Sequence, residues 1–167
     1  TALGQSQQFE VKPVPTAPVG TDFQEVTAFQ KTASELMRQV RAAGAELGRA
    51  DNRLRHMERA LVDAPQASNE LFSELNNVKT TLSNLQLRLF GDRVRGGMNE
   101  SSVPSIQGRI GRVVFGHWGT RQLPTETQKK NYELAREAFA QFRVDLDAFL
   151  NTNITQLESK LEAAGAP

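Results

Sequence analysis

A chain of 167 residues is long enough for one domain with a hydrophobic core, and 38% hydrophobic with 23% charged residues is typical of a globular protein. Lysine and arginine total 20 against 19 acidic residues, so a formal charge of +1 creates no overall field toward nucleic acid or anionic membrane. The lack of cysteine excludes disulfides, thiolate catalysis and sulfur-ligated metals. No run of about 18 apolar residues is present that could span a bilayer.

Residues 1–20 differ from the rest of the chain. Phe9 and Val11 alternate with charged residues, and a proline-rich stretch follows. This pattern predicts a short β or extended segment that leads into a linker. Because a lone strand cannot pair its edge, we expect it to be the remainder of an upstream β-domain, with a disordered tail as the alternative. The helical domain is then residues 21–167.

The longest apolar pattern predicts a helix over residues 22–62. Apolar residues recur every seven residues, and a second series offset by three runs through the same stretch. Thr21 and Asp22 are candidate caps, and Pro65 ends the segment. Such a helix is about 60 Å long. The seam consists of Val26, Phe29, Ala33, Leu36, Val40, Ala43, Leu47, Ala50, Leu54, Met57 and Leu61.

Two shorter helices are predicted next. The first follows a Ser68 cap, carries leucines and a valine at steps of four and three, and stops at Gly91 after about 35 Å. Residues 92–102 are polar and contain glycine, which predicts a loop. A short helix then has Pro104 in its first turn and ends near Gly116.

The last predicted helix begins at a capping box formed by Thr125 and Gln128 and breaks at Gly165. It is again about 60 Å long. Its apolar seam slips between Leu150 and Ile154, which predicts a local change in supercoil.

These lengths predict an all-α fold, an elongated up-down helical bundle. The two helices of about 40 residues run parallel, and the two shorter ones form a broken middle rod antiparallel to both. The alternative is a compact four-helix bundle, which would leave half of each long seam uncovered unless a second copy of the chain, as a homodimer, covered it.

The sequence offers few groups for catalysis. The two histidines are His56, on the outward side of the first helix, and His117, beside Trp118 in the loop before the last helix, where we expect an aromatic cluster at the bundle end. Paired carboxylates lie on solvated helix faces, and neither a nucleophile elbow nor a phosphate-binding glycine loop is present. We therefore predict no catalytic residue, no metal and no cofactor.

Arginines are concentrated around the third helix. The stretch from Arg88 to Arg121 contains six arginines and only two acidic residues. Arg109 and Arg112 are three apart and so share a helix face, from which they could hold a phosphate or carboxylate of a partner, with Trp118 as a further contact. The alternative is that such arginines tie down loops of their own fold. Without a series of aromatic residues beside them, the pattern argues against single-stranded nucleic acid. The six are Arg88, Arg93, Arg95, Arg109, Arg112 and Arg121.

The whole chain resembles a known family, and the motif residues lie in its second half. The residues that carry the resemblance are Asn99, Pro104, Ser105, Ile106, Arg109, Val113, Trp118, Pro124, Thr125, Gln128, Tyr132, Ala135, Phe139 and the closing Ala163 to Pro167. Together they resemble the C-terminal region of large bacterial BNR-repeat proteins, which are β-propellers of sortilin-like or glycosyl hydrolase type. The resemblance implies an upstream propeller, an accessory helical domain here, and a periplasmic or secreted location.

Three functions follow as hypotheses. The first is a non-catalytic accessory module that packs on upstream domains of its own chain or on another protein. The second is a wall of an active site in a glycoside hydrolase-like parent enzyme. The third is a polyanion-binding module that uses the arginines around Arg109.

Overall fold

The computed structural model describes residues 7–12, 20, 22–65 and 67–166, and within them every regular element is a helix. The predicted all-α bundle is confirmed. Residues 7–12 form no strand, and Phe9 and Val11 are 87% and 83% exposed. The predicted strand is therefore not found there, since no residue that the structure describes pairs with its edge. The rest of the predicted linker, residues 13–19, lies outside the described residues.

Helix α1 spans Phe23–Asp63, within one residue of the prediction at each end. The Asp22 side chain caps its start by accepting hydrogen bonds from the backbone amides of Gln24 and Glu25 at 2.9 and 3.1 Å. Ten of the eleven predicted seam residues are buried; Phe29 is half-buried, and Met37 joins the stripe. The period of three and four thus identifies the face of α1 that packs on the other helices.

The middle rod consists of α2, Asn69–Phe90, and α4, Ile106–Trp118. Ser68 caps α2 as predicted, and Gly91 ends it with a φ of +86° that favours glycine. Helix α4 begins later than expected, because its cap is Ser105, whose side chain accepts a hydrogen bond from the Gly108 amide at 3.1 Å. Pro104 therefore precedes the helix.

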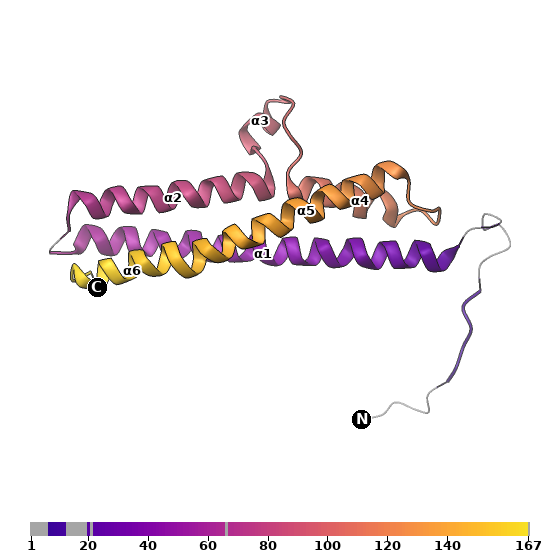
Figure 1. Ribbon diagram of the computed structural model, residues 1–167, viewed down its shortest axis with the longest axis horizontal. Coiled ribbons are helices and arrows are strands. Elements are labelled where there is room, and N and C mark those ends of the chain that lie inside the picture. The colour runs from indigo at the N-terminus through magenta and orange to yellow at the C-terminus, as the bar shows by residue number, and fades with distance from the viewer. Residues whose placement is uncertain (1–6, 13–19, 21, 66, 167) are drawn as a thin grey trace.

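Between the two halves of this rod the chain leaves the bundle. The stretch predicted as a loop contains a short helix, α3, over Arg93–Gly97, capped by Asp92. Figure 1 shows α3 and its connections standing off from the three rods. The Asp92 side chain favours a helix start at this point, because it accepts hydrogen bonds from the backbone amides of Val94 and Arg95.

The arrangement in space is the broken three-rod bundle (Figure 1). Helix α1 runs the full length, α2 and then α4 return along it in the opposite direction, and the last rod runs parallel to α1. A Cβ atom added at Gly91, at the end of α2, would lie 3.4 Å from the Cβ of Ser105, the cap of α4, so the two short helices nearly meet. Among the described residues, no helix is long and apolar enough to cross a membrane.

The last rod is α5, Glu126–Ala148, a π-helical segment η1, Phe149–Ile154, and α6, Thr155–Ala163. The predicted capping box of Thr125 and Gln128 is present. Buried residues follow steps of three and four up to Phe149, but the next is Ile154, five residues on. A π-turn holds about one extra residue, so it returns the seam to the core. The predicted slip is thus resolved by a change of helix type.

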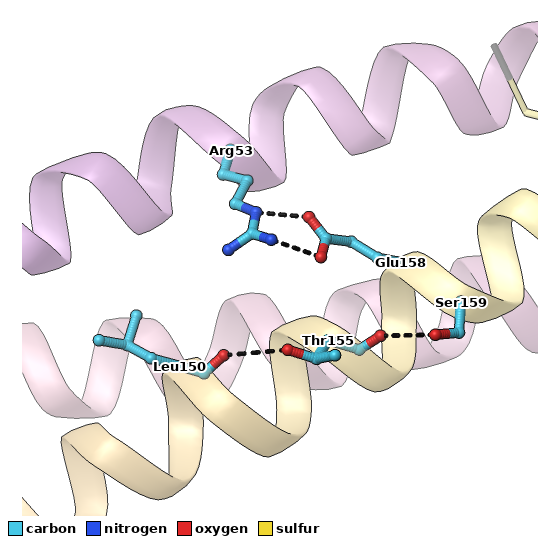
Figure 2. A network of polar contacts seen from close by, with 5 residues as sticks. All are labelled: Arg53, Leu150, Thr155, Glu158 and Ser159. Carbon is cyan, nitrogen blue, oxygen red and sulfur yellow. Dashed lines mark hydrogen bonds and ion pairs between the residues drawn. The ribbon is translucent and has the colours of Figure 1, made fainter.

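Contacts around η1 hold the two ends of the slip together (Figure 2). The Thr155 hydroxyl donates to the Leu150 carbonyl at 3.5 Å, five residues back, and Ser159 donates to the Thr155 carbonyl at 3.1 Å. One turn further on, Arg53 of α1 forms a two-pronged ion pair with Glu158 of α6. This pair fixes α6 against α1 just beyond the slip.

Removing the extra residue of the π-turn tests this account. Deletion of Thr152, which is exposed in η1, leaves a step of four between Phe149 and Ile154 and should give a continuous α-helix with the seam intact. We expect thermal stability equal to or above that of the wild type. Deletion of the exposed Asn52 from α1 is the matched control, because it rotates half of an unbroken seam by about 100° and should be strongly destabilising. Equal losses in both variants, measured by circular dichroism, would contradict the assignment.

Candidate binding groove

Two adjoining hollows lie along α4 on the side that faces α1 and the end of α2. Their volumes are about 400 and 450 Å³, and both are lined by Met37, Arg41 and Phe115. We call this surface the aromatic–arginine groove. It consists of Ser34, Met37, Arg38, Arg41, Phe90, Arg93, Ser105, Gln107, Gly108, Gly111, Arg112, Val114, Phe115 and Trp118.

Two large aromatic side chains stand in the groove with most of their surface in water. Phe115 is 70% exposed, and Trp118, the only tryptophan of the chain, is 72% exposed. Met37 and Val114 beneath them are buried at 5% and 9% exposure, so the floor of the groove is apolar. A contiguous exposed apolar patch beside polar groups is typical of an interaction site.

The charged groups that line the groove are all positive. No acidic side chain is among the residues that line either hollow. Arg41, Arg93 and Arg112 form no ion pair with any residue that the structure describes, while the Arg93 guanidinium lies 6.0 Å from the centre of the Phe90 ring. Arg38 is different, because its hydrogen bonds to Glu35 lower the pKa of that carboxyl group to about 2.

The wall of the groove depends on a close contact between α1 and Phe90. A Cβ atom added at Gly44 would lie 3.0 and 3.2 Å from two carbons of the Phe90 ring, so glycine lets this ring rest directly on the α1 backbone. On α4, Gly108 and Gly111 leave the groove open, and a Cβ at Gly111 would meet only side-chain carbons at 3.6 Å or more.

The predicted contact residues are divided between two places. Arg112 and Trp118 belong to the groove. Arg109 lies instead in a separate hollow of about 1020 Å³ beneath the α3 loop, and its Nη1 donates to Asn131 Oδ1 of α5 at 3.2 Å. Arg109 and Arg112 therefore line different hollows, although three residues separate them on one helix.

Several of the clustered arginines hold their own fold together, as the alternative interpretation proposed. Arg88 of α2 pairs with Asp145 of α5 at 2.6 Å and lies 5.8 Å from the centre of the Phe142 ring. Hydrogen bonding from Arg88 lowers the pKa of Asp145, and Gln141 adds to this effect. Arg95 stays within the α3 loop, 3.7 and 3.9 Å from its acidic neighbours.

The histidines take up different positions. His56 is exposed, as predicted. His117 lies in the last turn of α4 rather than in the following loop, is only 2% exposed, and packs edge-on against Phe29 with ring centres 5.3 Å apart. Its Nε2 is 3.0 Å from the Gln122 carbonyl, and its Nδ1 is buried without a hydrogen-bond partner. Phe29 also contacts Tyr132, which completes an aromatic cluster that excludes Trp118.

Sequence reasoning missed Arg41, Phe90 and Phe115. A usable signal was present on α4, which carries a second stripe beside its buried face, at steps of three and four. That stripe contains Gly108, Gly111, Phe115 and Trp118, with Arg112 beside it. Among the described residues, no group of three or more histidine, aspartate or glutamate side chains is placed to hold a metal ion.

Comparison with family models, with curated proteins and with solved structures gives no match to this chain. The groove therefore has to be interpreted from its own chemistry.

The seat of Phe90 can be tested with two glycines of α1. Gly48→Ala should raise the free energy of unfolding by about 0.5–1 kcal/mol, because nothing lies within 4 Å of the new Cβ and alanine favours a helix. Gly44→Ala has the same intrinsic gain but must displace the Phe90 ring, so we expect it to be about 1 kcal/mol less stable than Gly48→Ala. Urea denaturation measures both, and equal gains would show that Phe90 does not rest on Gly44.

The Arg88–Asp145 pair predicts a pH dependence. Because the pKa of Asp145 is lowered in the folded chain, the pair stabilises the fold above the pKa of an unfolded aspartate, about 3.9, and this contribution is lost as the pH falls through the lower folded value. Both side chains are partly exposed, so Asp145→Asn should cost only about 0.5 kcal/mol at pH 7. The deficit should shrink below about pH 4. Asp147→Asn, which removes no ion pair of the described residues, should show no such trend.

Proposed function

We propose that this helical bundle is a binding module that docks a protein partner, or another domain of a larger parent chain, through the aromatic–arginine groove. The observation that carries the proposal is the exposure of Phe115 and Trp118 beside an apolar floor. Tryptophan and arginine are the residue types that most often anchor protein interfaces.

The energetics of exposure favour a partner. Burial of two aromatic side chains of this size removes a few hundred Å² of apolar surface from water, which contributes roughly 5 kcal/mol before the costs of association. While Phe115 and Trp118 are exposed, these side chains contribute no packing energy to the isolated chain. In a complex, their burial against a partner would contribute that energy.

The charged groups of the groove suit binding better than catalysis. Arginine stays protonated at any ordinary pH, so Arg41, Arg93 and Arg112 can hold an anion but cannot exchange protons with a substrate. A groove that combines fixed positive charge with aromatic anchors recognises a surface through charge and shape. We therefore assign it no reaction.

The resemblance to BNR-repeat proteins extends this proposal. In such a parent protein, the upstream propeller or another protein would be the partner, and the bundle would be its non-catalytic accessory domain. The alternative role, a wall of a glycoside hydrolase-like active site, has its support in the hollow of about 1020 Å³ beneath α3, which is lined by Arg109 together with Ser101 and Ser102. That hollow lies away from the exposed aromatic pair.

A peptide display selection tests the binding role. The chain is presented to a random library, in parallel with a Phe115→Ser/Trp118→Ser variant. A matched control variant, Val62→Ser/Val144→Ser, removes two other apolar side chains that are 68% and 63% exposed. We expect the wild type and the control to enrich common peptides that the groove variant fails to bind, because the groove supplies the anchors.

The same peptides provide a direct readout. Their binding should shift the emission of Trp118 to shorter wavelength, because the indole leaves water. Enrichment that is identical for all three proteins, with no change in Trp118 emission, would contradict the proposed function.

A further inference from the structure

We propose that the occupant of the aromatic–arginine groove is an acidic amphipathic helix. Its apolar stripe would cover Phe115 and Trp118, and its carboxylates would pair with Arg41, Arg93 and Arg112. This inference rests on the proposed function and specifies the partner's chemistry.

The shape of the groove fits a helix. Two helices, α1 and α4, form its sides, and Met37 and Val114 form an apolar floor between them. It follows the chain from Ser105, the cap of α4, to Trp118 at the end of that helix, a length of about 20 Å. That length matches three to four turns of a ligand helix, which would present anchors at i, i+3 or i+4, and i+7.

The side chains of α4 leave space where such a helix must come close. Gly108 and Gly111 line the second hollow, and the atoms nearest to a Cβ added at Gly111 would be the Met37 methyl carbon at 3.6 Å and the Phe115 ring at 3.9 Å. Phe115 and then Trp118 follow these glycines along α4. A ligand helix can therefore come close to α4 beside these glycines, with the Phe115 ring next to it.

The positive charge of the groove favours a ligand with negative charge. Arg41 lines both hollows, while Arg93 and Arg112 lie at the end near Phe90, and no acidic residue lines either hollow. A docked helix would partly desolvate these three guanidinium groups. Carboxylates on the ligand would compensate that cost with charge-assisted hydrogen bonds, whereas lysines would add repulsion.

Other occupants fit less well. A second copy that docked groove to groove about a two-fold axis would bring arginines against arginines. Nucleic acid would supply phosphates, but it has no aliphatic stripe to cover Met37 and Val114. An anionic membrane favours a protruding surface, whereas here the apolar floor lies between two helices.

The test uses two synthetic helical peptides with the same leucine stripe, one flanked by glutamates and one by lysines. Emission of Trp118 is followed during titration. We expect the glutamate peptide to shift the emission and to bind at least tenfold more tightly than the lysine peptide, by an amount that falls with added salt.

Two variants locate the site. Arg41→Gln/Arg112→Gln should weaken the glutamate peptide about tenfold and flatten its salt dependence, while Arg59→Gln, an exposed arginine near the far end of α1, should leave both unchanged. Gly111→Leu should block the groove without a change in charge, and leucine favours a helix over glycine, so the fold should persist. Thermal unfolding of each variant verifies this.

Each outcome decides the matter. Equal binding of both peptides would overturn the proposal of an acidic helix. So would binding of the glutamate peptide that survives both the double arginine change and Gly111→Leu. The proposed function would still stand in either case if display-selected peptides need Phe115 and Trp118. Response to phosphatidylserine vesicles, heparin or duplex DNA in place of the glutamate peptide would also overturn it. A concentration-dependent emission shift with doubled mass would assign the groove to a second copy of the chain. Loss of all groove-dependent binding would reject the proposed function as well.

Discussion

The structure depends on one continuous apolar seam along α1. This stripe is buried from Val26 to Leu61, and the other rods pack against it. Three of its residues, Ala33, Ala43 and Ala50, are small and let the neighbouring helices approach closely. A 41-residue helix cannot cover such a stripe by itself, so the rest of the chain must supply partners of the same total length. The broken middle rod and the last rod with its π-turn are two ways of meeting that requirement.

The two solutions differ in how they restore register. In the last rod the chain keeps its helix and inserts a π-turn, so the seam returns to the core after one oversized step from Phe149 to Ile154. In the middle rod the helix stops at Gly91, the chain leaves the bundle through α3, and α4 begins with a register of its own. A π-turn preserves the direction of the helix and adds no new surface. A break opens a site at which two helix ends meet a third helix.

The parts of the fold that the sequence predicted are those set by local periodicity and caps. The bounds of α1, the caps Ser68 and Thr125, and the end at Gly91 each depend on residues within a few positions of one another. Helix α3 was missed because its one cap, Asp92, precedes a segment with two glycines and no apolar period. The π-turn appeared only as a slip, since spacing alone does not distinguish it from a change in supercoil.

The candidate site was less predictable, because it joins residues that are far apart in the chain. Arg112 and Trp118 were singled out, but the prediction paired Arg112 with Arg109, the nearest arginine on the same helix, whereas in space it lies with Arg41 of α1. Sequence spacing gives neighbours along one helix, and the groove is formed across three. Arg41 looked like an ordinary surface residue, and nothing local marked it as the partner of α4.

The position of the groove follows from the break in the middle rod. Phe90 and Arg93 flank the end of α2, and Ser105 begins α4, so both sides of the break line the same hollow. Because α4 restarts independently, its buried stripe ends in His117 while the adjacent stripe, with Phe115 and Trp118, faces outward beside α1. An unbroken middle rod would keep a single seam, and the side chains next to it would be solvated and polar. The interruption therefore supplies both features of the groove: a depression at the junction of three helices, and an apolar stripe that the bundle itself does not cover.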